Sequence, residues 1–421
     1  MCNKQHFRNS LPCTISGVAR VALAVAIVFV LTGSATQSAQ AQTYKVIYNF
    51  TLNGTGFQPY AGLTMDAAGS LYGTTSGGVN GPGTVFELTP KGSGWVFSLL
   101  HRFGAVGDGA LPWAGVAFGP DGTLYGTTAS GGVSGNGTVF NLSPPTTICR
   151  AVTCPWTETV LYSFTGGNDA NPALGDLVFD PAGNIYGTTI PAGGGVVYQL
   201  APSGNDWTEN VLHTFGSPGD GAQPAGGVIL DDAGNLYGTT VYGGASGAGT
   251  VFKLTYSAGL GWTETILYGF QGGNDGSEPY AGLIFDSSGN LYGTTTGGGQ
   301  GGGGVVFELT PSGSGWNYIL LHSFTGSYGP LGPLIMDSAG SLYGTTYGDG
   351  ADGAGNIFEL TPSGGGWTYT SLHDFSTDRH DGSNPIGNVI LDSHGNLYGT
   401  TSNGGTGCRY NNCGVVWEIT P

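Results

Sequence analysis

The chain has few charged residues, and few of these are basic. Among its 421 residues, 27 are Asp or Glu and only 10 are Lys or Arg, which gives a formal net charge of −17. Such an acidic surface repels phosphate groups, so the composition argues against nucleic acid and anionic membranes as partners. No helical periodicity of useful length follows residue 41, which argues against an α-helical fold.

The first 41 residues have the pattern of a secretory signal peptide. The apolar run is too short to span a bilayer comfortably, and small and polar residues follow it. We therefore expect cleavage after residue 41, a mature protein over residues 42–421 with a net charge of −20, and secretion to the medium or periplasm without a membrane anchor. The features of the leader are three basic residues, an apolar run and a small-x-small cleavage site: Lys4, Arg8, Arg20, residues 21–31 and residues 39–41.

An internal repeat dominates the rest of the chain. The run [Leu/Ile]-Tyr-Gly-Thr-Thr occurs seven times at spacings of 51 to 61 residues, as expected of one supersecondary unit with variable loops. The seven tyrosines of this run are Tyr72, Tyr125, Tyr186, Tyr237, Tyr292, Tyr343 and Tyr398.

Each copy contains four strand-like segments separated by turn residues. In one copy they are residues 281–286, 291–295, 304–310 and 316–324. Four antiparallel strands repeated seven times predict an all-β fold, a seven-bladed β-propeller in which each copy is one blade. We number the blades 1 to 7 from the copy of Tyr72 to that of Tyr398.

The two ends of the chain complement each other. Residues 44–50 match the fourth strand of the unit, whereas residues 414–420 match the third. The last blade thus lacks an outer strand and the first segment supplies one, so we predict that strand 44–50 pairs with the C-terminal blade and closes the ring.

The cysteines after residue 41 form two close pairs, Cys149 with Cys154 and Cys408 with Cys413. In an exported protein such pairs predict local disulfides, and a zinc site shared by both pairs is the alternative. The first pair lies between strands three and four of its blade, and the second between strands two and three. These loops emerge on opposite faces of a propeller, which favours two local disulfides.

The motif Asp-x-x-Gly-Asn-Leu-Tyr-Gly-Thr-Thr-x-x-Gly-Gly, followed by Gly-x-Val-Phe-Glu-Leu-Thr-Pro, resembles the GloVer-type tandem repeat of exported bacterial proteins. The resemblance covers residues 44–421. It implies an extracellular protein, often with a C-terminal sorting tail, and no established activity. No such tail follows Pro421, so we expect a free extracellular or periplasmic protein.

Residue types that recur at one position in most blades are expected to serve the scaffold. His101, His213, His322 and His373 alternate with tyrosine at one position of strand four, which indicates an aromatic packing role. The tryptophans that begin strand four are expected to pack over neighbouring backbone, against the glycine of strand two. The aspartates that open the turn between the first two strands are Asp66, Asp180, Asp231, Asp286, Asp337 and Asp392.

A second acidic set lies in the loops that join successive blades. These carboxylates are either Asp-Gly turns repeated for geometry, which we favour, or a ring of Ca²⁺ ligands. No cofactor is otherwise indicated. The set is Asp108, Asp169, Asp220, Asp275 and Asp381.

The candidate ligand-binding residues are those at which single blades depart from the repeat. Tyr60, Trp113 and Tyr280 follow the loop proline of three blades, where other blades hold mostly small or aliphatic residues. Asp176 and Asn388 add polar groups to inner strands that are otherwise apolar. Aromatic rings at a channel mouth suit stacking on a sugar; a loop-anchoring role is the alternative.

No catalytic constellation is evident. Asp176 has no histidine or second carboxylate beside it in the inner-strand pattern, and no metal motif or phosphate loop is present. The sequence therefore favours a non-catalytic binding or scaffold module for glycans or another exported protein. The alternatives are a propeller enzyme, such as a lyase or a Ca²⁺-dependent lactone hydrolase, and a structural protein of the envelope or matrix.

Overall fold

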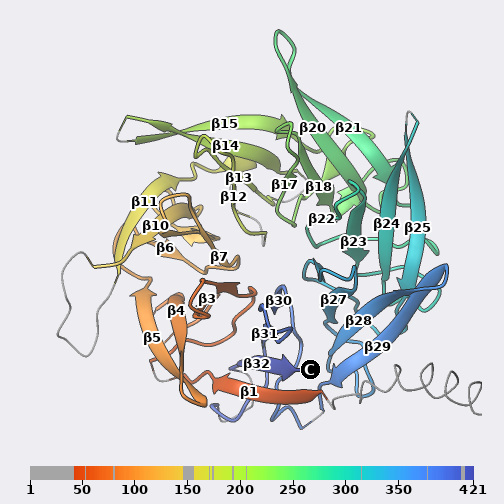
Figure 1. The fold of residues 1–421 in the computed structure, drawn as a ribbon. Coiled ribbons are helices and arrows are strands. Elements are labelled where there is room, and N and C mark those ends of the chain that lie inside the picture. Colours follow the sequence, from red (N-terminus) through yellow and green to blue (C-terminus); the bar gives the residue numbers. More distant parts are fainter. Residues whose placement is uncertain are drawn as a thin grey trace, which may run out of the picture. The chain divides into compact units, whose positions relative to one another are not determined.

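Seven four-stranded antiparallel sheets, one for each copy of the repeat, are arranged in a ring (Figure 1). The computed structural model describes residues 42–421 with gaps, and the ring comprises Tyr44–Thr420. The predicted signal peptide and the pair Cys149 and Cys154 lie outside the described residues. The gaps are residues 53, 79–80, 146–155, 170, 173–174, 192–193, 205, 314, 377 and 409–412.

The two inner strands of each blade are short. The innermost strands are β2 (Thr64–Met65), β7 (Val116–Phe118), β12 (Val178–Phe179), β17 (Ile229–Leu230), β22 (Ile284–Phe285), β26 (Ile335–Met336) and β30 (Ile390–Leu391). The second strands, which carry the Tyr-Gly-Thr motif, are β3 (Leu71–Thr75), β8 (Leu124–Thr128), β13 (Ile185–Thr188), β18 (Leu236–Thr240), β23 (Leu291–Thr295), β27 (Leu342–Thr346) and β31 (Leu397–Thr401).

The two outer strands are longer. The third strands are β4 (Thr84–Lys91), β10 (Thr138–Ser143), β14 (Val196–Ser203), β20 (Thr250–Ser257), β24 (Val305–Ser312), β28 (Asn356–Ser363) and β32 (Val415–Thr420). The outermost strands are β5 (Gly94–Arg102), β11 (Thr157–Ser163), β15 (Asp206–Thr214), β21 (Gly261–Gly269), β25 (Gly315–Ser323), β29 (Gly366–Asp374) and, in blade 7, β1 (Thr43–Asn49).

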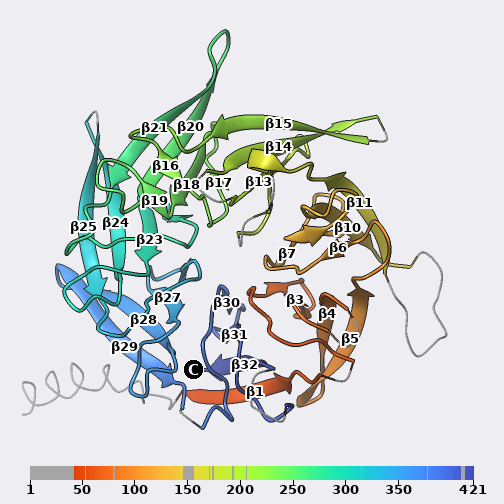
Figure 2. The same ribbon diagram turned by 180° about the vertical axis from the view of Figure 1, so that it is seen from behind.

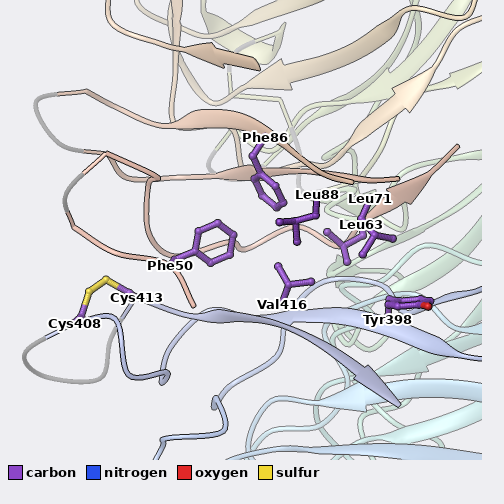
Figure 3. Close-up of a cluster of buried hydrophobic side chains, with 9 residues drawn as sticks. All are labelled: Phe50, Leu63, Leu71, Phe86, Leu88, Tyr398, Cys408, Cys413 and Val416. Carbon is purple, nitrogen blue, oxygen red and sulfur yellow. A yellow bond between two sulfur atoms is a disulfide. The ribbon is translucent and has the colours of Figure 1, made fainter. Parts of the chain in front are cut away.

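The strand exchange between the chain ends is confirmed. β1 pairs with β32, so the first strand of the chain completes the last blade (Figures 1 and 2). Phe50, directly after β1, is fully buried with Leu71, Phe86 and Val416 (Figure 3). The disulfide between Cys408 and Cys413, whose Cα atoms are 5.7 Å apart, lies beside this cluster.

Packing within a blade explains the glycine of the Tyr-Gly-Thr motif. The ring of Phe86 on β4 comes within 2.7 Å of the position that a Cβ of Gly73 would occupy, so a side chain there would displace the ring. An aromatic ring of the third strand faces the equivalent glycine in all seven blades. The tryptophans do not pack on this glycine as expected; instead they pack against the motif tyrosine of the preceding blade. Examples are Trp95 with Tyr398 and Trp156 with Tyr72.

The turn aspartates are bonded within their own blades. Asp231 accepts hydrogen bonds from the backbone N–H groups of Ala233 and Asn235 and from the hydroxyl of Tyr237, at 2.8 to 3.0 Å. Blade 2 has Gly119 at this position, and Asp121 two residues later accepts the hydrogen bond of Tyr125 instead, at 3.0 Å.

Two further pairs of short strands join the connection between two blades to the loop that follows the second strand of the next blade. β6 (Gly109–Ala110), in the connection from blade 1 to blade 2, pairs with β9 (Ser130–Gly131), which follows the second strand of blade 2. β16 (Gly221–Ala222) pairs with β19 (Tyr242–Gly243) in the same way in blade 4. A single 3₁₀ turn, Gly167–Asp169, is described in the connection from blade 2 to blade 3. Among the described residues, no helix is long and apolar enough to cross a membrane.

Candidate functional site

A cavity of about 160 Å³ lies where all seven blades meet. Its walls are formed mostly by the residues that lead into the innermost strands. Tyr60, Trp113, Asp176 and Tyr280, the four candidates from the sequence, all line this one cavity, and so does Asn388. Residues that are 53 to 328 positions apart in the chain are thus brought together.

Small residues dominate the wall because neighbouring backbones touch there. A Cβ on Gly387 would overlap the backbone of Gly62, and a Cβ on Gly175 would overlap that of Gly227. The pattern is seen at the position just before the buried aliphatic residue that leads into, or begins, each innermost strand. Five blades have glycine or proline there and two have polar residues. These positions are Gly62, Gly115, Asp176, Gly227, Gly282, Pro333 and Asn388.

Asp176 supplies the charge of the cavity. Burial raises the pKa of its carboxyl to about 6, and the hydrogen bond that the Gly115 N–H donates to Oδ1, 2.7 Å long, opposes this shift. Among the described lining residues, no other carboxylate, histidine, lysine or arginine is present. The cavity therefore offers one carboxylate, mostly ionised at neutral pH, but no acid–base pair.

Asn388 lies on the opposite part of the ring, in blade 7. Its side chain occupies the space next to Gly62 of blade 1, where a Cβ would overlap it. The amide of Asn388 can both donate and accept hydrogen bonds, whereas ionised Asp176 only accepts them. Together the two side chains can bind a ligand that carries hydroxyl groups.

The three aromatic side chains are held by a repeated backbone device. Each follows a proline, and the residue before that proline has left-handed backbone geometry, with φ of 56° for Leu111. The Leu111 N–H donates to Pro82 O of the preceding blade at 2.6 Å, and Leu111 O accepts from the Ala129 N–H at 3.0 Å. The loop that carries Trp113 is therefore fixed on both sides, which orders the ring before any ligand binds.

In four blades the first threonine of the motif also holds the cavity wall, at Thr74, Thr188, Thr239 and Thr400. Thr74 Oγ1 donates to Ala114 O, the residue after Trp113, at 2.9 Å, and Thr239 Oγ1 donates to Ala281 O, the residue after Tyr280, at 2.8 Å. Both bonds cross from one blade to the next. The motif that builds the blades therefore also positions the aromatic residues.

Three tyrosines that the sequence did not single out lie beside these aromatics. Burial raises the pKa of Tyr60, and the neighbouring Tyr347 raises it further. Burial also raises the pKa of Tyr280, with further increases from the neighbouring Tyr242 and Tyr328. The rings of Tyr328 and Tyr347 meet edge to face, 6.1 Å apart.

A signal for two of these residues was present in the sequence. Tyr347 follows the motif directly, at a position that holds Ser76, Ala129 and Thr296 in other blades, so it departs from the repeat as Trp113 does. Tyr242 lies one position further on, where other blades have Gly77, Ser130 and Gly297, so it departs from the repeat as well. Tyr328 lies in a loop whose length differs between blades, so no repeat position could identify it.

The loop carboxylates considered as a Ca²⁺ ring do not line this cavity. Asp108 accepts hydrogen bonds from the N–H groups of Gly104 and Gly109 in its own loop, at 3.0 and 2.7 Å. Asp275 accepts one from the hydroxyl of Tyr268 at 2.8 Å. These carboxylates face their own turns and the fourth strands of the blades.

The comparisons with known proteins agree with the repeat and the fold. The model of the Gloeobacter/Verrucomicrobia repeat family matches residues 28–154, 152–329 and 258–421. No curated protein sequence matches the chain.

Solved structures similar to this chain were found at low sequence identity. A putative 6-phosphogluconolactonase from Bacteroides uniformis is 12% identical, with a TM-score of 0.52 over 83% of this chain and 98% of that one. A putative oxidoreductase (glucose dehydrogenase) from Thermus thermophilus is 19% identical, with a TM-score of 0.44 over 75% and 98%. A protein from Lactobacillus plantarum is 14% identical, with a TM-score of 0.49 over 82% and 88%.

Proposed function

The chain belongs to the Gloeobacter/Verrucomicrobia repeat family, and we propose that it is an exported propeller that binds carbohydrate at its axial cavity without catalysis. One observation carries the proposal. Tyr60, Trp113 and Tyr280, which break the small-residue pattern of the repeat, line the same cavity as the polar residues Asp176 and Asn388.

This combination matches the surface of a sugar. A sugar ring has an apolar C–H face, which packs on aromatic rings, and a rim of hydroxyl groups, which bond to carboxylate and amide groups. The cavity is smaller than the 300 to 1,000 Å³ typical of pockets for larger ligands, so it suits one terminal sugar unit. Tyr242, Tyr328 and Tyr347 would contact the units that follow.

The leader and the charge are consistent with this function. A signal peptide over residues 1–41 would bring the protein to the periplasm or medium, where glycans are accessible. The strongly acidic mature chain would disfavour anionic polymers, so the expected ligand is a neutral glycan. Another exported protein remains the alternative partner.

A second candidate function rests on Asp176. A pKa of about 6 suits a general base near neutral pH, as a lyase or lactone hydrolase would need. The cavity offers no second acid or base among its described residues, which is why binding is the function we favour.

A glycan-array screen of the mature protein tests the proposal. We expect neutral glycans with a shared terminal sugar among the hits. Trp113→Ala and Tyr280→Ala should each bind at least about tenfold more weakly, because each removes an aromatic ring that packs on the sugar and a loss of about 1.4 kcal/mol is tenfold in affinity. Leu331→Ala, at the equivalent position of blade 6, is the matched control and should bind within about threefold of the wild type.

Two outcomes contradict the proposal. If Trp113→Ala leaves every hit unchanged, the aromatic residues are loop anchors and the binding site lies elsewhere. If the protein converts sugar lactones or uronate polymers and Asp176→Asn abolishes the turnover, the enzyme alternative replaces it.

A further inference from the structure

A second set of positions recurs at the outer part of the boundary between successive blades. Three side chains converge there: the histidine or tyrosine of strand four, the loop carboxylate after it, and the residue two places after the tryptophan of the next blade. At two boundaries this set is one histidine, one aspartate and one glutamate. The groups are His101, Asp108 and Glu158 between blades 1 and 2, and His213, Asp220 and Glu264 between blades 3 and 4.

The ligand atoms of each group are close together. His101 Nε2 lies 3.4 Å from Asp108 Oδ2, and within each group one atom from every residue lies within 4.8 Å of the others. His213 Nε2 lies 3.3 Å from Asp220 Oδ2 and 3.9 Å from Glu264 Oε2. Ligands about 2 Å from a tetrahedral metal ion are roughly 3.3 Å apart, so the spacing already approaches that of a bound ion.

Each group also contains buried carboxylate oxygen that lacks a partner. Oε1 of Glu158 and Oε1 of Glu264 are buried and accept no hydrogen bond from the described residues. The side chains of Asp108 and Glu264 are only 3% and 14% exposed. Two carboxylates that share a poorly hydrated site require a cation or a proton between them.

The other boundaries provide internal comparisons. Between blades 2 and 3, Tyr162 replaces the histidine, and its hydroxyl donates to Glu209 Oε2 at 2.8 Å. Between blades 4 and 5, both the histidine and the glutamate are tyrosines, Tyr268 and Tyr318, which stack with centroids 4.6 Å apart.

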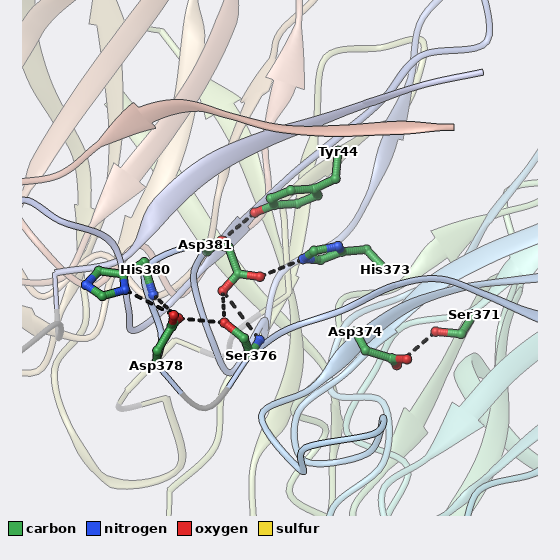
Figure 4. A network of polar contacts seen from close by, with 8 residues as sticks. All are labelled: Tyr44, Ser371, His373, Asp374, Ser376, Asp378, His380 and Asp381. Atoms are coloured by element: carbon green, nitrogen blue, oxygen red, sulfur yellow. Dashed lines mark hydrogen bonds and ion pairs between the residues drawn. The ribbon is translucent and has the colours of Figure 1, made fainter. Parts of the chain in front are cut away.

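The boundary between blades 6 and 7 keeps the histidine and the aspartate but not the glutamate. His373 Nε2 lies 2.9 Å from Asp381 Oδ2, and Tyr44 stacks on the imidazole with ring centroids 3.7 Å apart (Figure 4). Histidine and aspartate alone therefore form a hydrogen-bonded pair covered by an aromatic ring. The combination of a histidine with two carboxylates distinguishes the first and third boundaries, since the boundary between blades 2 and 3 has Asp169 and Glu209 but no histidine.

We propose that these two His-Asp-Glu groups are binding sites for a divalent transition-metal ion of the Zn²⁺ class. Imidazole nitrogen favours zinc over calcium or magnesium, which prefer oxygen ligands alone. Three protein ligands leave the fourth position of a tetrahedral ion to water. The histidine and aspartate belong to one blade and its exit loop, and the glutamate to the next blade, so the ion joins the two blades.

Zinc titration of the untagged mature protein tests this inference. The protein is stripped with EDTA and dialysed, and Zn²⁺ binding is followed by calorimetry and by elemental analysis. We expect two ions per chain and a higher melting temperature with Zn²⁺. Loss of a supporting residue outside the ligand set typically costs 10- to 100-fold in affinity, so the double variant Glu158→Gln, Glu264→Gln should bind at least about 100-fold more weakly.

Glu209→Gln is the matched control, because Glu209 occupies the same position without a histidine beside it. It should retain both ions and the full melting shift. Circular dichroism of the metal-free proteins verifies folding, and glutamine keeps the shape of glutamate while removing the repulsion between carboxylates. The inference is wrong if the folded wild type binds no Zn²⁺, in which case each pair shares a proton. It is also wrong if the double variant binds as the wild type does or if Glu209→Gln loses an ion.

Discussion

The ring of Phe50 packs edge to face against the ring of Phe86, with the two centroids 5.1 Å apart. Phe50 follows the first strand of the chain, which belongs to blade 7, and Phe86 lies on the third strand of blade 1. This contact therefore joins blade 7 to blade 1, where the ring closes.

Phe50→Ala should lower the free energy of unfolding by about 3–5 kcal/mol, because it leaves a cavity in a fully buried cluster. Chemical denaturation measures the loss. Phe103→Ala, the equivalent residue between blades 1 and 2, should cost a similar amount, and the exposed Val106→Ala less than about 0.5 kcal/mol. A change at Phe50 as small as that at Val106 would show that the closure contributes little to stability.

Deletion of residues 42–50 should lower the melting temperature sharply, since it uncovers the edge of β32.

Thr400→Val and Thr294→Val should differ although they change the same motif position. Thr400 Oγ1 donates to Ala61 O across the closing boundary at 2.7 Å, whereas Thr294 Oγ1 is buried and bonds to no described group. Loss of the first bond should destabilise by about 1–2 kcal/mol, and the second replacement should be neutral or slightly stabilising. Denaturation curves of the two variants measure both stability changes. Equal changes would contradict the stabilising role given to the hydroxyl group of Thr400.

Asp176→Asn should be more stable than the wild type at neutral pH. The pKa of Asp176 is raised from 3.8 to about 6, so the folded protein binds the proton more tightly than the unfolded chain does. The wild type therefore loses stability as the pH rises from about 4 to about 6, and the loss then stays constant at about 3 kcal/mol. The stability difference between the two proteins, measured from pH 4 to 8, should grow over that interval and level off. A constant difference would mean that Asp176 titrates normally.

The disulfide should stabilise the blade that the chain ends complete. Cys408 and Cys413 are separated by five positions, and closing so short a loop stabilises by roughly 2 kcal/mol. The double variant Cys408→Ser, Cys413→Ser should show that loss in denaturant, and a reducing agent should lower the stability of the wild type but not of the variant. Equal sensitivity of both proteins to reduction would assign the effect to other cysteines.

The repeat made most of the fold predictable. Seven motifs, four strand-like segments in each and complementary ends determine the number of blades, the order of strands and the closure by residues 44–50. Comparison between blades also separated Tyr60, Trp113, Asp176 and Tyr280 from the scaffold. The comparison is possible because every blade must solve the same packing problem, so a residue that differs in one blade stands out against six others.

Only the tertiary structure decided which of these residues meet, and with what. Tyr328 reaches Tyr280 from a loop whose length differs between blades, where the sequence offers no reference position. The histidines looked uniform along the chain, yet His101 and His213 face a glutamate of the next blade, while His373 is covered by Tyr44. The repeated sequence shows which residues each blade contains. The contacts between neighbouring blades depend on the curvature of the ring, because it determines which of their side chains come within bonding distance.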